Sequence, residues 1–331
     1  MPPFVHLHVH SEYSLLDGLA KLDDLIAKAK SFNMPALALT DHGSLYGAAK
    51  FFFAAKKAGI KPIIGIETYI APNGMSNRGS KDDRRPFHLV LLAKNLQGYK
   101  NLIQITSAAH LKGFYYKPRV DLDFLQKHAD GLIALSACLK GEIAYYASID
   151  DLPKAEAKAK KYLSIFGPGN FYLELQHHTE VPKQAVTNTR LITLSKKLGI
   201  GLVATNDVHY VERADATAQD ILLCLQSKST LNDADRGLKM SGDDFHFASP
   251  EEMAKNFAAV PEALANTVKI AEQCNVEFEK TGLILPEAKI PQGENLPGYL
   301  RKLTYDGIKQ RLKREPNASE KKRLDCELGV I

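Results

Sequence analysis

The alternation of short apolar runs with helical patterns constrains the fold of this chain more than any other sequence feature. Runs that predict strands cover residues 5–9, 36–40, 62–70, 88–93, 131–136, 170–175 and 201–205. Between most of these runs, apolar residues recur at helical spacing, as they do at residues 22–29. Strands that alternate with helices favour a parallel sheet with right-handed crossovers. Seven strands are enough to close a barrel, and an open sheet is the alternative.

The second part of the chain follows a different pattern. After Tyr210 it is mostly helical, and two further helices are predicted near the end, over residues 299–312 and 319–331. A length of 331 residues suits one large α/β domain with an appendage. We predict a domain over residues 1–275 and a linker with a following segment over 276–331. The chain stops within an apolar helical pattern, so we expect it to be part of a longer protein.

Composition excludes several classes of protein. An apolar fraction of 45% is typical of globular proteins, and no stretch approaches the roughly 20 uncharged apolar residues of a membrane span. The N-terminus lacks a signal-peptide pattern, so we expect a cytoplasmic protein that does not contact a membrane. Widely separated cysteines without a CxxC pair argue against a disulfide framework and indicate a reducing compartment. They are Cys138, Cys224, Cys274 and Cys326.

Three histidines alternate along the first predicted strand. Because alternate side chains of a strand share one face, His6, His8 and His10 could converge on one point. Converging neutral imidazoles are the ligands that a zinc-like ion needs. The alternatives are an edge strand with chance histidines or an expression tag. A tag is usually a contiguous run, whereas these histidines are interleaved with Val and Leu.

Metal-binding residue types also occur in or next to the other predicted strands. Asp41 and His42 follow the second strand, Glu67 lies in the third, and Cys138 follows the fifth. Functional residues of α/β barrels lie at the carboxyl ends of the strands, and His88, at the start of the fourth strand, fits this rule less well. Three of these residues have another possible explanation. Asp41 could cap a helix, Cys138 could be a small buried apolar residue, and His88 could be a core histidine.

The last predicted strand repeats the spacing of the first. It runs into Asp207 and His209, which are two residues apart, as His8 and His10 are. One zinc ion takes about four ligands, so the full set predicts a cluster of two or three ions, with Glu67 available as a bridge. Ligation by N and O atoms with one thiolate suits Zn²⁺ and/or Mn²⁺ better than Mg²⁺. The nine candidate ligands are His8, His10, Asp17, His42, Glu67, His88, Cys138, Asp207 and His209.

A cluster of this kind indicates phosphoester hydrolysis. Closely spaced divalent ions yield hydroxide from bound water near neutral pH and stabilise the charge of a reacting phosphate ester. The sequence contains no Ser/His/Asp nucleophile motif, P-loop or dinucleotide fingerprint. The residues therefore predict a metal-dependent phosphoesterase in which a metal-bound hydroxide, rather than a side chain, is the nucleophile.

These motifs resemble those of the PHP (polymerase and histidinol phosphatase) family. Within it they are more closely similar to the domain that begins the alpha chain of bacterial replicative DNA polymerases. The similarity spans about residues 4–275, and residues near 331 resemble the entry to the palm region of such a polymerase. The segments that carry it are HLHVHSEYSLLDG, GIKPIIGIETYI, HLVLLAKNLQGYKNL, FYYKPRVD, SACLKGEI and ATNDVHY.

The resemblance implies a distorted seven-stranded (β/α) barrel with a trinuclear metal site at the carboxyl ends of the strands, followed by a mostly helical segment. It also implies how the ligands are shared. One ion would take His8, His10, Glu67 and Asp207, a second would take Glu67, His88 and Cys138, and a third would take Asp17, His42 and His209. Stand-alone phosphatases of the family tend to have His in place of Cys138 and Asp17, so this set favours the polymerase branch.

A loop over residues 112–119 combines cations with aromatic rings. Single-stranded nucleic acid stacks its bases on such rings while its phosphates meet the charges, although the rings could instead pack into the core. The candidate DNA contacts are Lys112, Tyr115, Tyr116, Lys117 and Arg119.

Together with the resemblance, the complete ligand set and this loop predict a 3′–5′ exonuclease that proofreads during DNA replication. Its partners would be the single-stranded 3′ end of a primer, the rest of the polymerase alpha chain and other replisome subunits. The whole protein would be a DNA-directed DNA polymerase. The alternatives are a metal-stabilised docking domain without nuclease activity and a small-molecule phosphatase.

Overall fold

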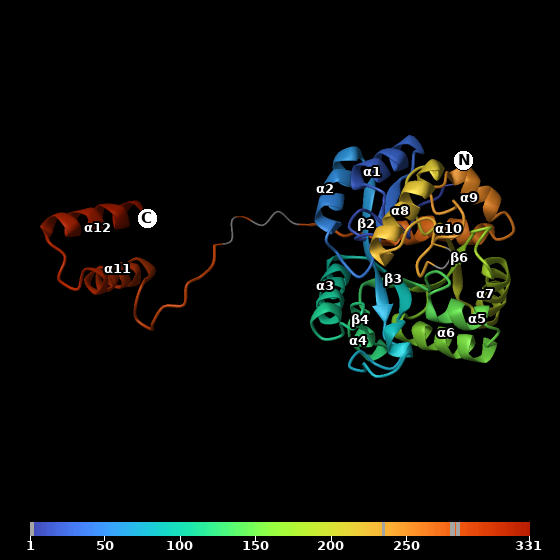
Figure 1. Ribbon diagram of the computed structural model, residues 1–331, viewed down its shortest axis with the longest axis horizontal. Helices are drawn as coiled ribbons and strands as arrows, with labels where there is room; N and C mark the ends of the chain where they lie inside the picture. The colour runs from blue at the N-terminus through green and yellow to red at the C-terminus, as the bar shows by residue number, and fades with distance from the viewer. Residues whose placement is uncertain (1–2, 234–235, 279–281, 283–284) are drawn as a thin grey trace. The chain divides into compact units, whose positions relative to one another are not determined.

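The chain forms two compact units, Met1–Phe278 and Glu279–Ile331. The computed structural model describes residues 3–233, 236–278, 282 and 285–331. The first unit is built on a seven-stranded sheet with helices packed around it (Figure 1). The strands are β1 (Ala36–Leu39), β2 (Lys61–Ile70), β3 (Phe87–Ala93), β4 (Arg119–Val120), β5 (Leu132–Leu135), β6 (Phe171–Gln176) and β7 (Gly201–Thr205).

The sheet follows the order β1-β2-β3-β5-β6-β7, and the short strand β4 pairs with β2. The β1–β2, β5–β6 and β6–β7 pairs are parallel. Most strand residues are buried, which explains why each strand reads as a continuous apolar run. The predicted distorted seven-stranded α/β barrel is confirmed, with two differences in its strands.

The first difference concerns the predicted strand at residues 5–9. This segment lies between β1 and β7, and among the described residues it has only one isolated bridge, between Val9 and Val208. On one side the Ala38 and Thr40 amides donate to the carbonyls of His6 and Val9, at 3.0 and 2.8 Å. The Thr40 hydroxyl also accepts from the Val9 amide at 2.8 Å, so a side chain replaces part of the regular ladder. The seventh strand is therefore β4, which begins at Arg119, the last residue of the loop that we predict to bind DNA.

On its other side the same segment is bonded to the residues that follow β7. The His10 amide donates to the Val208 carbonyl at 2.8 Å, and the Val208 amide donates to the His8 carbonyl at 3.2 Å. Residues 6–10 therefore bridge the two ends of the strand order and bring His8 and His10 beside the end of β7.

The second difference corrects the direction of one strand. The sequence pattern predicts parallel strands throughout, but β3 runs antiparallel to both β2 and β5. In this register His88 pairs with Tyr69, near the carboxyl end of β2. The start of β3 therefore lies at the same edge as the carboxyl ends of its neighbours. This explains why His88 lies at the start of its strand, whereas the other candidate ligands lie late in a strand or after one.

The helices of the first unit have apolar faces that pack on the sheet and on one another. In α1 the buried residues are Leu22, Leu25, Ile26 and Ala29, at the predicted spacing. The helices are α1 (Leu22–Ser31), α2 (Ala48–Ala58), α3 (Leu96–Leu111), α4 (Leu122–Lys127), α5 (Glu142–Ser148), α6 (Leu152–Phe166), α7 (Gln184–Leu198), α8 (Ala216–Ser227), α9 (Pro250–Asn256) and α10 (Pro261–Gln273), with 3₁₀ turns η1 (Asp82–Arg84) and η2 (Arg213–Asp215).

Side chains cap several of these helices at their first turn. At α9 the Ser249 hydroxyl accepts a hydrogen bond from the Glu252 amide at 3.2 Å, and at α3 the Asn95 side chain accepts from the Gly98 amide at 2.9 Å. Each cap satisfies an amide that has no partner within the helix. The caps therefore fix where these helices begin.

The second unit contains α11 (Leu296–Leu312) and α12 (Ala318–Val330). Tyr305 of α11 donates a hydrogen bond to the Asp325 carboxylate of α12 at 2.7 Å, and Arg301 forms an ion pair with the same carboxylate. The predicted linker includes residues 279–281 and 283–284, which lie outside the described residues. The assignment of 276–331 to a linker and palm entry stays a prediction. Across the described residues, no helix has both the length and the apolar character that a bilayer span needs.

Candidate metal centre

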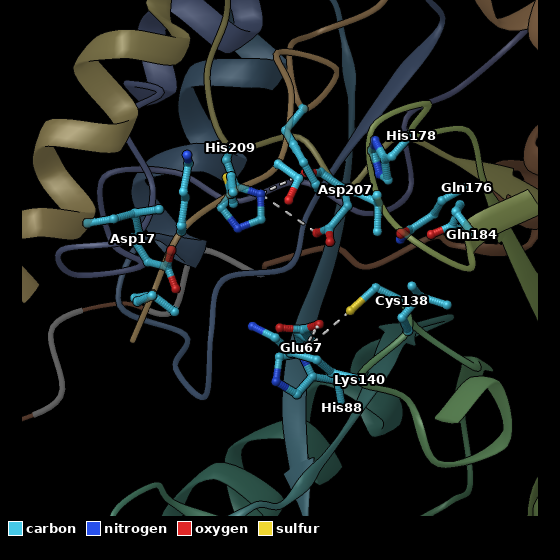
Figure 2. Close-up of a pocket in the computed structure, with 18 of the residues that line it drawn as sticks. Asp17, Glu67, His88, Cys138, Lys140, Gln176, His178, Gln184, Asp207 and His209 are labelled. Carbon is cyan, nitrogen blue, oxygen red and sulfur yellow. Dashed lines mark hydrogen bonds and ion pairs between the residues drawn. The ribbon is translucent and has the colours of Figure 1, made fainter. Parts of the chain in front are cut away.

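The nine candidate ligands, which lie far apart in the sequence, come together at the edge of the sheet where the strands β1, β2, β6 and β7 end. Seven of them line a cavity of about 190 Å³, and His8 and His10 lie fully buried beside them. Figure 2 shows Asp17, Glu67, His88, Cys138, Asp207 and His209 directed toward this cavity. His6 is not part of the group, because its Nε2 atom pairs with the Ala248 carbonyl at 2.9 Å.

One group of ligand atoms consists of His8, His10 and Asp207. Asp207 Oδ1 lies 3.1 Å from His8 Nε2 and 3.2 Å from His10 Nε2, and the two imidazole nitrogens are 3.1 Å apart. Asp207 has a φ angle of +47°, a left-handed conformation that Asp tolerates better than most residues. Three possible donors thus converge on one small volume, as around a metal ion.

Glu67 forms a second group with His42 and His88, and it also approaches His8 and His10 of the first. One of its carboxylate oxygens is 3.4 Å from His8 Nε2 and 2.7 Å from His88 Nδ1. The other is 3.9 Å from His10 Nε2 and 2.5 Å from His42 Nδ1. A carboxylate that reaches four imidazoles has the position that a bridging ligand needs.

The remaining candidates extend the cluster on both sides of Glu67. Asp17 Oδ2 lies 3.2 Å from His42 Nε2, and His209 groups with His10 and His42. Cys138 Sγ lies 4.0 Å from a ring nitrogen of His88.

The surroundings of Cys138 and His42 bear on how the ions would be shared. Burial raises the pKa of the Cys138 thiol, so its thiolate needs a nearby cation. His42 approaches both Glu67 and Asp17, so it could serve either of two ions. The division of ligands among three ions stays a prediction.

Several buried atoms of the cluster lie close to one another but form no hydrogen bond of suitable geometry among the described residues. They are both ring nitrogens of His42, Oε2 of Glu67 and Oδ1 of Asp207. Buried polar atoms are nearly always paired, and leaving one unpaired costs about 1–3 kcal/mol. Since imidazole nitrogens and carboxylate oxygens are the donors of Zn²⁺ and Mn²⁺ sites, divalent ions fit the unpaired atoms of this cluster.

The electrostatics of the cluster favour cations. Burial disfavours the ionised form of a carboxyl group, but the nearby His88 and His42 imidazoles hold the pKa of Glu67 well below its usual range. Burial is likewise outweighed at Asp207, where His8 helps to keep the carboxyl pKa well below its usual range. Two buried carboxylates that stay ionised attract divalent ions.

Glu174 of β6, which the sequence analysis missed, orients His8. Its Oε1 atom lies 2.7 Å from His8 Nδ1 and accepts hydrogen bonds from Thr205 at 2.5 Å and Gln176 at 2.9 Å. A proton on Nδ1 leaves Nε2 of His8 free to bind a metal, and such a carboxylate also raises the basicity of the ring. The available signal was a Glu within an otherwise apolar predicted strand.

We predict that Glu174→Gln weakens metal binding about 10–100-fold, the usual effect of removing a carboxylate that orients a ligating histidine. Competition with a chromophoric chelator would measure the affinity. Glu156→Gln is a suitable control, because Glu156 pairs with surface lysines on α6 and α7. Equal affinities for the parent and Glu174→Gln would contradict this role.

Other cavity-lining residues were also missed, among them Lys140, Gln176, His178 and Gln184 (Figure 2). Lys140 follows Cys138 by two residues, so its proximity to a candidate ligand was a usable signal. Gln176 and His178 lie within three residues after the predicted strand over residues 170–175, which was a comparable signal, whereas Gln184 begins α7 and had none.

The predicted DNA-binding residues differ in exposure. Lys112, Tyr116 and Lys117 are exposed, and Tyr115 is half-buried. Arg119 is fully buried, and its guanidinium donates hydrogen bonds to backbone carbonyls within the protein. Our proposal for DNA contact therefore excludes Arg119 and retains the other four residues.

Comparison with known proteins places the chain in a family. The family model of the PHP domain matches residues 6–178, and this chain therefore belongs to the PHP domain family. It is 48% identical over 332 residues to the DNA polymerase III subunit alpha of Borreliella burgdorferi, a match covering 99% of this chain and 28% of that protein. It is 43% identical over 345 residues to the corresponding subunit of Aquifex aeolicus, covering 99% of this chain and 30% of that protein.

The chain thus spans less than a third of the length of these relatives. Among solved structures, it matches a two-domain protein of Bacteroides vulgatus described as containing a predicted PHP-like metal-dependent phosphoesterase. The TM-score is 0.38 at 14% identity, over 62% of this chain and 52% of that one.

Proposed function

We propose that this chain is the PHP domain of a bacterial replicative DNA polymerase alpha subunit and that its metal centre is a 3′–5′ exonuclease that proofreads primer ends. The observation that carries the proposal is the convergence of nine ligand-type side chains on one cavity, with buried ring nitrogens and carboxylate oxygens left unpaired. The high identity to DNA polymerase III alpha subunits supports DNA as the substrate.

In this proposal the nine candidate ligands hold two or three Zn²⁺ and/or Mn²⁺ ions. Such ions, when bound, activate water and stabilise negative charge on a phosphodiester. Glu174 keeps Nε2 of His8 directed toward the centre, and His209 Nδ1 pairs with the Asp207 carbonyl at 2.7 Å, which leaves Nε2 of His209 free for the centre.

Lys140 supplies a positive charge beside the ligands. Its side chain lines the cavity. Burial opposes its protonation, but the acidic groups around it, including Cys138, Asp17 and Glu67, keep its pKa above the usual value. A lysine that stays protonated can bind a non-bridging phosphate oxygen. We assign Lys140 the role of holding the scissile phosphate.

The predicted DNA-binding loop lies next to the metal centre. Lys117 Nζ is 5.5 Å from the ring centroid of Tyr69, and this ring is 5.1 Å from that of His88 and 6.2 Å from that of His42. Tyr116 is 62% exposed, so a base can stack on it. This proximity supports a role for the loop in guiding a single-stranded 3′ end toward the cavity.

We predict that Asp207→Asn reduces release of the terminal nucleotide about 100-fold, because it removes a charged ligand from the group with His8 and His10. The assay uses the 331-residue chain, a 3′-labelled single-stranded primer, and added Mn²⁺ or Zn²⁺. Asp150→Asn is the control, since Asp150 is an exposed partner of Arg190 on the surface.

Three outcomes would reject the exonuclease proposal. If Asp207→Asn degrades the primer as fast as the parent, the centre is not responsible for the activity. If the parent binds metal, melts at lower temperature after chelation and leaves DNA intact, the domain has a structural role. Hydrolysis of histidinol phosphate without hydrolysis of DNA would indicate a small-molecule phosphatase.

A further inference from the structure

One buried side chain of the cavity has no role in the metal centre described above. His178 is only 3% exposed, it lines the cavity, and neither of its ring nitrogens has a hydrogen-bond partner among the described residues. Within that part of the chain, it is also not a member of the groups that could hold an ion. A buried imidazole with two unpaired nitrogens is costly, so binding of a ligand that pairs with them would be favoured.

The His178 ring is held in a fixed position. It stacks on Phe245 with the ring centroids 4.0 Å apart and the planes 18° from parallel. The next residue, Thr179, donates hydrogen bonds from its amide and its hydroxyl to Asp244, at 3.0 and 2.9 Å. The Phe245 carbonyl accepts from the His209 amide at 2.9 Å. The segments around His178 and Phe245 thus form one wall of the cavity. This wall is hydrogen-bonded to the candidate ligand His209 and is pre-organised for binding.

The His178 side chain itself is neutral, in contrast to the ionised carboxylates of the metal centre. Burial lowers the pKa of His178 to about 4, so at neutral pH the ring offers one donor and one acceptor. Figure 2 shows His178 together with the amides of Gln176 and Gln184. The Gln184 amide nitrogen donates to Asn188 at 3.1 Å, and that of Gln176 donates to Glu174, so each keeps its carbonyl oxygen as an acceptor.

The cavity thus combines two chemically different parts. Lys140 and the metal ligands suit a phosphate, whereas His178 and the two glutamines suit uncharged groups that both donate and accept hydrogen bonds. A nucleoside monophosphate has these two parts, and a cavity of about 190 Å³ is small compared with most ligand pockets. It suits the end of one strand rather than a duplex.

We propose that the His178 end of the cavity is a subsite for the neutral nucleoside of the terminal nucleotide, whose phosphate lies at the metal centre. This inference rests on the proposed exonuclease function and specifies which part of the substrate His178, Gln176 and Gln184 recognise. Sugar hydroxyls and base edges offer the same hydrogen-bonding chemistry, and the experiment distinguishes them.

The test is calorimetric binding of three probes to the Mn²⁺-loaded chain: deoxyadenosine 5′-monophosphate, 2-deoxyribose 5-phosphate and inorganic phosphate. We expect the parent to bind the nucleotide at least about tenfold more tightly than phosphate, the effect of one or two net hydrogen bonds. His178→Phe keeps a ring against Phe245 and removes both nitrogens, and it should lose this preference while binding phosphate as the parent does. His177→Phe is the matched control, because His177 does not line this cavity.

Unchanged nucleotide binding by His178→Phe, or a parent that does not prefer either organic probe to phosphate, would overturn the subsite. A preference for deoxyribose phosphate equal to that for the nucleotide would support contact with the sugar, and a preference for the nucleotide alone would support contact with the base. If nucleotide binding depends on His178 but the parent does not degrade DNA, the exonuclease proposal fails and the subsite stands.

Discussion

Substitution Glu67→Gln is expected to reduce exonuclease activity by about a thousandfold or more and to lower the amount of metal bound per chain. Glu67 approaches His8, His10, His42 and His88, so its loss would affect more than one group of ligands. The amide keeps the size of the side chain but removes the charge with which Glu67 would bridge two ions. Loss of several kcal/mol of charge stabilisation corresponds to this change in rate.

Elemental analysis and the labelled-primer assay would measure the two effects of Glu67→Gln. Glu142→Gln is the matched control, since Glu142 is also buried but pairs with Lys158 and Tyr162 away from the cavity. We expect it to keep both metal and activity. Full metal content together with full activity in Glu67→Gln would show that Glu67 is not a bridging ligand.

Substitution Arg119→Met is expected to lower the free energy of unfolding of the first unit by about 3 kcal/mol or more. The Arg119 guanidinium donates to the carbonyls of Gly113 at 3.1 Å, Asp83 at 2.6 Å and Asn77 at 3.0 Å. It is fully buried, so Met would leave these carbonyls without partners and without water. Arg119 thereby joins the loop before β3 to the loop before β4.

Urea unfolding monitored by circular dichroism would measure the stability of Arg119→Met. Arg119→Lys keeps the charge but lacks the planar fork of donors, so we expect a smaller loss than for Met. Lys117→Met in the same loop is the surface control and should leave stability nearly unchanged. An Arg119→Met variant as stable as the parent would contradict the structural role.

The positions of most strands could be predicted because each is buried and therefore apolar along its whole length. The direction of β3 could not, because an apolar run reads the same in a parallel and an antiparallel strand. The position of His88 indicated the reversed direction of β3. His88 lies at the start of its strand, while Glu67 and Asp207 lie late in a strand or after one. The irregular path of residues 5–9 also escaped prediction, because the Thr40 side chain interrupts its ladder.

The candidate site was predictable where residue type alone suggests the chemistry. Histidines and acids at strand ends are recognisable in the sequence, and the structure brings the nine candidates together. Glu174 and His178 are different, because their roles depend on the atoms that face them in the folded chain. Arg119 was predicted to contact DNA but is buried. A cation among aromatic residues can face DNA or donate to backbone carbonyls, and the sequence does not distinguish the two.

The bridging of β1 and β7 by residues 6–10 has a consequence for the order of folding. His8 and His10 are synthesised well before Asp207, with which they share the centre and which follows β7. Contacts so distant along the chain form late, because the intervening loop must first be closed. We therefore expect metal to enter a barrel that is already folded, and nascent chains that end before Asp207 to carry ligands without a complete centre.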